Sequence, residues 1–291
     1  MRIVFAHTDF RIYWPARMKA LNSFLTARGI SFEVVEIAGG GSPYSFEKKN
    51  NLRPSYWHCI FPDRSMEKIK SIEANIALRN KLDELNPDIV FAGAIAFPSG
   101  AGAVRWAVEN KKRVVIFDNA RLQDVPRTRI TNFIKKQVYK NVDAVLCPAQ
   151  AWNRTFNYFG FDNNQIFHGL NVVDNEFWSN GSKNDRKEAL GQYFLSIGRQ
   201  VEKKNFLFLL KSYKQYCIKS DSPSPLCLVG SGPERKSLEE YVEKHNLKKV
   251  RFLQFASQAE LKNIYGNAKC FILPSKYGET WGLVVSEAMA S

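Results

Sequence analysis

The chain has 291 residues, 45% of them hydrophobic, which is enough for about two domains with separate cores. No stretch approaches the roughly 18 apolar residues of a membrane-spanning helix, and residues 1–7 have the form of a buried strand and not of a signal peptide. The net charge of +14 favours phosphate-bearing partners but forms no basic tail, and the cysteines and histidines lack metal-ligand spacing, so we expect a cytoplasmic protein without a metal.

Short runs rich in valine, isoleucine and phenylalanine alternate with longer segments of helical periodicity in the first part of the chain. This alternation is typical of βαβ units that build a parallel sheet. The expected strands are residues 2–7, 32–37, 88–93, 113–117, 143–147 and 165–168. The expected helices are residues 15–28, 66–85, 98–110, 127–141 and 149–159. These elements predict one doubly wound α/β domain over residues 1–173.

The expected helix near residues 127–141 is amphipathic and basic. Its apolar residues fall on one face and its cations lie elsewhere, the two sets being Ile130, Phe133, Ile134 and Val138, and Arg129, Lys135, Lys136 and Lys140. One interpretation is a helix that covers the sheet and turns its charges to solvent. The other is peripheral contact of these cations with anionic lipid, at the inner face of the membrane.

Residues 174–192 are polar and rich in turn-forming residues, and we interpret them as an interdomain linker. The βαβ pattern then resumes, with strands expected at residues 193–198, 226–230, 249–254 and 269–273 and helices at residues 204–219, 233–245 and 257–267. A last helix begins near Trp281 and has neither a glycine cap nor a following strand. We therefore expect residues 193–291 to be a second α/β domain that is incomplete.

In open parallel sheets, ligands bind where strands end and helices begin. The segment from Ser196 to Asn205 follows an expected strand and contains Gly198, Arg199 and Lys204. The glycine permits close approach of the backbone to a ligand, and the two cations suit a diphosphate. The alternative is a helix start whose basic residues face solvent.

The segment from Pro274 to Glu287 also follows an expected strand. Glu279 and Glu287 are eight positions apart, a spacing of about 12 Å in a continuous helix, and the N–H groups near Gly282 and Leu283 suit a phosphate. The alternative places Glu279 in an ordinary loop and Glu287 in solvent.

The pairing of Gly-Arg-x4-Lys with a later Glu-x7-Glu resembles family 4 of the retaining glycosyltransferases, also known as glycosyl transferases group 1. The resemblance covers the second domain, including residues 228–234 and 255–261, and the junction at residues 168–174. It implies the GT-B fold, in which two Rossmann-like domains face a cleft. It also implies transfer of a sugar from a nucleotide diphosphate sugar, of UDP or GDP type, to a saccharide or lipid-linked acceptor during envelope polysaccharide synthesis.

The resemblance further implies a role for each matching residue. Arg199 and Lys204 would hold the donor diphosphate, Glu279 would position the transferred sugar, and Glu287 would bind the ribose hydroxyls. Retention would proceed by displacement on the same face within an ion pair, so that neither a covalent nucleophile nor a metal is needed.

The first domain departs from the family pattern in two places. The segment from His7 to Pro15 stands where similar enzymes carry a glycine pair, and residues 117–121 stand where many place a histidine. Asp118 and Arg121 could take over contacts in the cleft, although Asp118 could equally cap the next loop.

Two other functions are compatible with the sequence. A basic α/β module could bind nucleic acid, but the even spread of charge argues against that function. A chain with an incomplete second domain could also be a catalytically inactive fragment.

Overall fold

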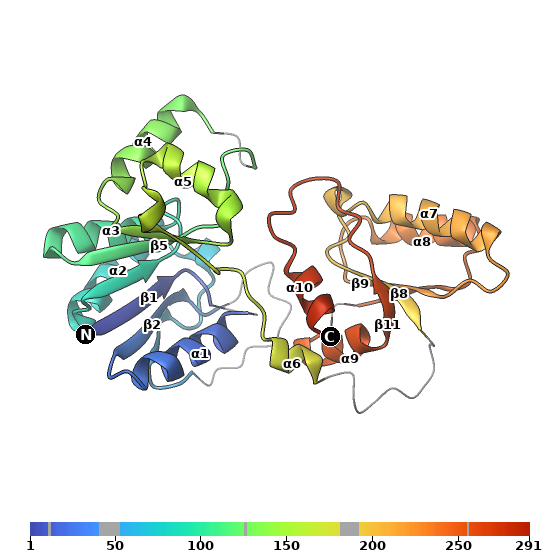
Figure 1. Ribbon diagram of the computed structural model, residues 1–291, viewed down its shortest axis with the longest axis horizontal. Helices are drawn as coiled ribbons and strands as arrows, with labels where there is room; N and C mark the ends of the chain where they lie inside the picture. The colour runs from blue at the N-terminus through green and yellow to red at the C-terminus, as the bar shows by residue number, and fades with distance from the viewer. Residues whose placement is uncertain (11–12, 41–52, 125–126, 181–191, 255) are drawn as a thin grey trace. The chain divides into compact units, whose positions relative to one another are not determined.

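The computed structural model describes residues 1–10, 13–40, 53–124, 127–180, 192–254 and 256–291. These residues form two compact units, Met1–Asn171 and Val172–Ser291. In Figure 1 the first unit runs from blue to yellow-green and the second from yellow to red. Each unit contains its own parallel sheet, which confirms the α/β class.

The sheet of the first unit has seven strands in the order β3-β2-β1-β4-β5-β6-β7, all of them parallel. Its helices pack on both faces, because alternate side chains of each strand point to opposite sides. Along β1, for example, Val4 and Ala6 belong to one buried cluster and Ile3 and Phe5 to another. The elements are β1 (Arg2–His7), α1 (Trp14–Thr26), β2 (Ser31–Ala38), β3 (Trp57–Phe61), η1 (Met66–Lys68), α2 (Ser71–Leu85), β4 (Ile89–Ala92), α3 (Pro98–Asn110), β5 (Arg113–Phe117), α4 (Arg129–Tyr139), β6 (Ala144–Cys147), η2 (Gln150–Trp152), α5 (Asn153–Phe159), η3 (Asn163–Gln165) and β7 (Ile166–His168).

All six strands expected in this unit are confirmed, and β3 is an additional one. The sequence between β2 and β3 is rich in Gly, Ser, Pro and Asn and shows no helical periodicity, so the alternation of strands and helices gave no signal for β3. It lies at the edge of the sheet beside β2.

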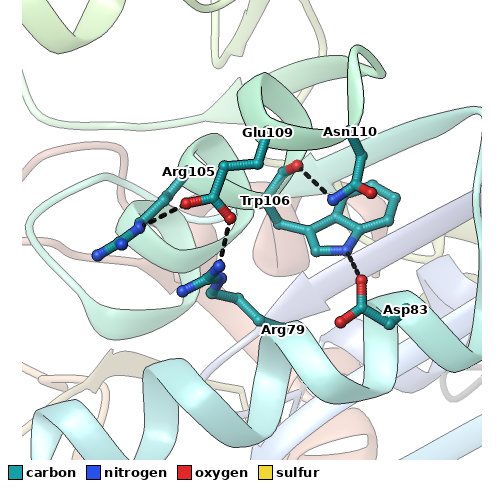
Figure 2. A network of polar contacts seen from close by, with 6 residues as sticks. All are labelled: Arg79, Asp83, Arg105, Trp106, Glu109 and Asn110. Atoms are coloured by element: carbon teal, nitrogen blue, oxygen red, sulfur yellow. Dashed lines mark hydrogen bonds and ion pairs between the residues drawn. The ribbon is translucent and has the colours of Figure 1, made fainter.

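Helices α2 and α3 pack closely against each other over the sheet. A Cβ atom built on Gly102 would lie 2.9 Å from Asn75 Nδ2, so the small residue permits the close approach. Figure 2 shows the polar contacts that fix the register: Trp106 Nε1 donates to Asp83 Oδ1 at 2.6 Å, and the Glu109 carboxylate pairs with both Arg79 and Arg105.

Helix α4 is oriented differently from the first interpretation of its sequence. Ile130, Phe133 and Ile134 are exposed, whereas Lys135 and Tyr139 turn toward the sheet. The interpretation that this apolar face covers the sheet is therefore wrong for these three residues, whereas the fourth, Val138, packs against the buried cluster. Lys135 and Tyr139 both donate hydrogen bonds to the carboxylate of Asp118, which follows β5. These contacts determine which side of α4 faces the sheet.

The sheet of the second unit has four parallel strands in the order β10-β9-β8-β11. All four strands expected here are confirmed. Leu226 and Leu228 of β9 face the cluster around α7 and α8, and Cys227 and Val229 face the cluster around α6 and α9. The elements are α6 (Asn175–Ser179), β8 (Tyr193–Ile197), η4 (Glu202–Lys204), α7 (Phe206–Lys219), β9 (Leu226–Val229), α8 (Arg235–Lys244), β10 (Val250–Leu253), α9 (Gln258–Gly266), β11 (Ala268–Phe271) and α10 (Leu283–Ala290).

The segment interpreted as a linker at residues 174–192 is partly helical. Asp174 caps α6 by accepting a hydrogen bond from the backbone N–H of Phe177 at 2.9 Å, and Trp178 is buried with its ring perpendicular to that of Tyr265. Phe177 and Trp178 of α6 thus pack into the core of the second unit, and residues 181–191 lie outside the described residues. The division at Asn171 falls two residues before the boundary expected at residue 173.

Candidate functional site

The order of strands in the second unit points to a candidate ligand-binding edge. β8 has β9 on one side and β11 on the other, so the direction in which the chain winds reverses between β8 and β11. Ligands of open α/β sheets bind outside the carboxyl ends of the strands at such a reversal. The loops that leave β8 and β11 are residues 198–205 and 272–282, the two segments that the sequence singles out.

Four polar contacts join these loops, the longest being the ion pair of Lys276 with Glu202 at 3.9 Å. The Lys204 ammonium group pairs with the Glu279 carboxylate, although 75 positions separate the residues. Asn205 Nδ2 donates to the carbonyl of Pro274 at 3.1 Å, and the Lys276 N–H donates to the carbonyl of Lys203 at 2.9 Å. The loops therefore form one structure and position two of the predicted site residues against each other.

Lys204 is the last residue of the short 3₁₀ helix η4 and is not part of the longer helix that follows. The helix expected from residue 204 begins at Phe206, because Asn205 takes a left-handed conformation with φ of 58°. That turn ends η4 and directs the Asn205 side chain to the other loop. Asparagine tolerates this conformation better than most residues.

Glu279 has a second partner, which the sequence did not point to. Ser275 Oγ donates to Glu279 Oε2 at 2.9 Å, so that a cation and a hydroxyl fix one carboxylate. Gly282 lies beside it, since a Cβ atom on Gly282 would be 3.6 Å from Glu279 Cγ. These contacts place a carboxylate at the entrance to α10.

The start of α10 provides backbone donors. Gly282 has φ of 73° and immediately precedes Leu283, the first residue of the helix. The first N–H groups of a helix have no partner within it, and they carry the positive end of the helix dipole. An anion can bind there.

Glu287 occupies a different environment from Glu279. It is only 2% exposed, and its Oε2 accepts a hydrogen bond from Tyr265 OH at 2.7 Å. The alternative of a solvent residue is therefore wrong. The distance expected for a continuous helix does not apply, because the helix begins at Leu283, four positions after Glu279.

Glycines of a third loop support the segment that contains Arg199. A Cβ atom on Gly230 would lie 2.2 Å from the Gly198 carbonyl oxygen, and one on Gly232 would lie 2.3 Å from that of Gln200. The backbone after β8 thus rests directly on the backbone after β9. Gly198 in turn contacts Lys204, whose Cε would be 3.6 Å from a Cβ at that position.

Gln200 is a further residue that the sequence gave no reason to select. Its side chain is 0% exposed, and neither polar atom of the carboxamide has a hydrogen-bond partner within the described part of the chain. A buried polar group without partners costs about 1–3 kcal/mol. Such a cost, next to the half-buried Arg199, is typical of a functional position.

In the first unit, Asp118 and Arg121 have partners of their own. Asp118 is 5% exposed and accepts from Lys135 Nζ at 3.0 Å, Tyr139 OH at 3.3 Å and the Ala120 N–H at 2.9 Å. The last bond is the loop cap that the sequence left open as an alternative. Burial, with the negative charge of Asp118, raises the pKa of Tyr139 well above its usual value.

Arg121 forms two hydrogen bonds with Asp124, at 2.7 and 2.9 Å, and its guanidinium lies over the Trp152 ring. The charge of Arg121 is therefore compensated by Asp124 in the loop after β5, and the charge of Asp118 is compensated by Lys135 on α4.

The corresponding reversal of the first sheet lies between β1 and β4. His7 ends β1 there, packed against the rings of Phe10, Trp14 and Phe117. Burial lowers the pKa of His7 to about 4, so the imidazole is neutral at physiological pH.

Two kinds of feature are absent from the described residues. They contain no group of three or more His, Cys, Asp or Glu side chains that could hold a metal ion. None of their helices has both the length and the apolar character needed to cross a membrane.

Relatives of known structure or function resemble this chain at low identity. O-antigen chain mannosyltransferase RfbU of Salmonella typhimurium is 35% identical over 107 residues, which are 36% of this chain and 29% of that protein. A glycosyltransferase from Rickettsia africae superimposes with a TM-score of 0.74 at 13% identity, covering 99% of this chain and 76% of its own. Alr3699/HepE of Anabaena, solved with UDP and glucose, gives a TM-score of 0.68 at 13% identity and covers 100% and 78%.

The chain spans less than a third of the length of the mannosyltransferase, so that match concerns a part of each protein. Two families account for almost the whole chain: residues 176–291 match Glycosyl transferases group 1, and residues 17–177 match Glycosyltransferase Family 4. Since the second match covers more than half of the residues, and both units have the parallel sheets of the GT-B fold, the chain belongs to glycosyltransferase family 4.

Proposed function

We propose that this protein transfers a hexose or related sugar from a nucleotide diphosphate sugar to a saccharide or lipid-linked acceptor, with retention of configuration. The observation that carries the proposal is the pairing of Lys204 with Glu279 at the reversal of the second sheet. We further propose that it acts in the cytoplasm during envelope polysaccharide synthesis.

The charges at this edge match the chemistry of a departing diphosphate. As the sugar leaves, negative charge accumulates on the diphosphate, and fixed cations there stabilise the transition state. In the proposal, Arg199 and Lys204 supply these cations and the N–H groups after Gly282 bind a phosphate oxygen. No metal ion is assigned, because two side chains already provide the positive charge.

In the proposal, Glu279 binds the transferred sugar of the donor and Glu287 binds the ribose. Glu279 holds Lys204 and is itself held by Ser275, which makes it a rigid acceptor for sugar hydroxyls. Glu287 binds the ribose hydroxyls, and Tyr265 orients its carboxylate. The displacement occurs on one face of the sugar within an ion pair, without a covalent nucleophile.

Two relatives support the class of donor. The Anabaena structure contains UDP and glucose, and the Salmonella protein is named for mannosyl transfer to an O-antigen chain. Both names concern hexoses, which favours a UDP- or GDP-hexose for this chain.

The test is transfer and binding with a panel of UDP- and GDP-sugars. Arg199→Ala and Lys204→Ala are each expected to lower kcat/KM roughly 100-fold, which corresponds to a loss of about 3 kcal/mol of transition-state stabilisation. Lys211→Ala, which removes an exposed cation on α7, is the matched control and should leave the rate unchanged. Activity should also persist in EDTA.

The proposal fails if no nucleotide sugar binds, or if binding and rate are the same in the wild type and both site variants. A loss of activity on chelation that added Mg²⁺ or Mn²⁺ restores would remove the metal-free mechanism but not the assignment of the cations.

A further inference from the structure

Helix α4 presents an apolar strip to solvent. Ile130, Phe133 and Ile134 are 72%, 63% and 56% exposed, although all three side chains are large and hydrophobic. At 3.6 residues per turn they fall within about 100° around the helix axis. Contiguous exposed apolar side chains of this kind mark an interaction surface.

A basic strip runs beside the apolar one. Arg129, Lys136 and Lys140 are exposed, and they fall within about 40° of one another on the adjoining side of the helix. Thus the outer half of α4 combines three apolar side chains with three cations. We call these six residues the α4 face.

The inner face of α4 fixes this orientation. Lys135 Nζ donates to Asp118 Oδ2 at 3.0 Å and lies over the rings of Tyr139 and Phe159, and Tyr139 OH donates to the same carboxylate. Thr128 caps the helix by accepting from the Thr131 N–H at 3.1 Å. Turning the apolar strip inward would leave Asp118 buried without its cation, a change that costs several kcal/mol.

We propose that the α4 face docks on an anionic lipid bilayer, with Ile130, Phe133 and Ile134 inserted at the level of the headgroups and the three cations bound to lipid phosphates. Helices that lie in the membrane interface combine these two elements, an apolar face and basic residues. The net charge of +14 attracts the whole protein to the same surface.

Another exposed apolar pair lacks the charges and serves as a comparison. Ile72 and Ile76 on α2 are also exposed. Between them in the sequence stands an acidic residue, Glu73, which pairs with Arg64. This pair offers apolar area without a row of cations, so it should not bind anionic lipid.

The experiment is flotation of the chain with vesicles of phosphatidylcholine alone or mixed with phosphatidylglycerol. The wild type should float with the mixed vesicles and stay in the lower fraction with the neutral ones. Arg129→Gln/Lys136→Gln/Lys140→Gln should weaken binding by roughly fivefold for each cation removed. Phe133→Ser/Ile134→Ser should weaken it about tenfold or more while leaving the salt dependence in place.

Matched controls separate the α4 face from charge and apolar area in general. Ile72→Ser/Ile76→Ser replaces two other exposed apolar residues, and Lys211→Gln/Lys219→Gln/Lys236→Gln removes three other exposed cations. Both should float nearly as well as the wild type. Thermal unfolding of each variant verifies that it is folded.

Equal recovery of the wild type with neutral and anionic vesicles would overturn the proposal. So would unchanged flotation of both α4 variants, or a result in which Phe133→Ser/Ile134→Ser only converts a dimer into a monomer. Because flotation requires neither donor nor acceptor, its failure would leave the proposed sugar transfer untouched.

Discussion

The buried acidic side chains Asp118, after β5, and Glu287, in α10, each have a defined partner. Asp118 pairs with Lys135, and Glu287 accepts from Tyr265. His7 is the contrasting case, because its Nδ1 is enclosed and has no hydrogen-bond partner among the described residues. Burial destabilises the protonated imidazole, because the aromatic surroundings cannot solvate a cation, and this lowers the pKa of His7 to about 4.

The first prediction follows from His7. Above pH 6.5 the imidazole is neutral in both the folded and the unfolded chain. As the pH falls from 6.5 toward 4, the unfolded chain binds a proton that the folded chain does not, so the free energy of unfolding should fall by up to about 3 kcal/mol. Urea titrations at pH 7 and 4.5 should show a smaller fall in His7→Gln than in the wild type.

Other groups also titrate in this range, so the comparison needs a second histidine variant. His168 is exposed, and His168→Gln controls for the loss of a histidine side chain as such. An equal fall in wild type and His7→Gln would show that burial of His7 does not contribute.

Single residues differed in how far the sequence determined them. The meeting of Lys204 with Glu279 could be anticipated, because both follow strands and carboxyl ends of parallel strands share one edge. The burial of Glu287 could not, since it depends on Tyr265, which α9 brings into position beside α10. Gln200 gave no local signal, because its burial comes from the loop after β9.

At the scale of elements, the loop after β9 acts as a backbone support for the loop after β8. Gly230→Ala is expected to destabilise the protein by about 3 kcal/mol or more, because φ of 127° strains alanine and its Cβ would overlap the Gly198 carbonyl. Gly160→Ala is the control: its φ is also positive, at 103°, but its Cβ would meet nothing within 4 Å. It should show the strain alone, about 1–2 kcal/mol.

Chemical denaturation of the two variants gives these values. Donor binding should also weaken in Gly230→Ala, because displacement of Gly198 moves Lys204. Equal destabilisation by both substitutions would mean that the loop after β8 moves away from the new Cβ atom without lowering the free energy of unfolding.

Elements were predictable where local pattern decides them. Ten strands appeared at their expected places because each is a short, mostly apolar run between segments of different pattern. The orientation of α4 was not predictable, because periodicity identifies an apolar face but not the side to which it points. There the partner, Asp118, decides.

At the scale of the whole molecule, the two units have separate sheets and separate buried clusters. All predicted donor contacts with Lys204 and Glu279 lie in the second unit. Calorimetry should therefore resolve two transitions, and UDP should raise only the one that Gly230→Ala lowers. At 100 times its Kd a ligand adds about 2.7 kcal/mol, a shift on the order of 10 °C for a unit of this size.

A shift of both transitions by the same amount, or a single transition in the presence and absence of UDP, would contradict this assignment. UMP is a useful control, because it lacks the second phosphate that the two cations would bind, and its effect should be smaller.

The contacts between the loops after β8 and β11 also bear on how the second unit acquires its ligand-binding edge. Asn205 and Pro274, like Lys204 and Glu279, are about 70 residues apart, with three strands, β9, β10 and β11, and three helices between them. Bringing the ends of so long a segment together lowers the chain entropy, and only the interactions of the completed sheet compensate for this loss. We therefore expect the contacts between the two loops to form late in folding. In the proposed mode of binding, a nascent chain that ends at Phe271 lacks Glu279, so it would bind a nucleotide sugar only after the loop that follows β11 has been made.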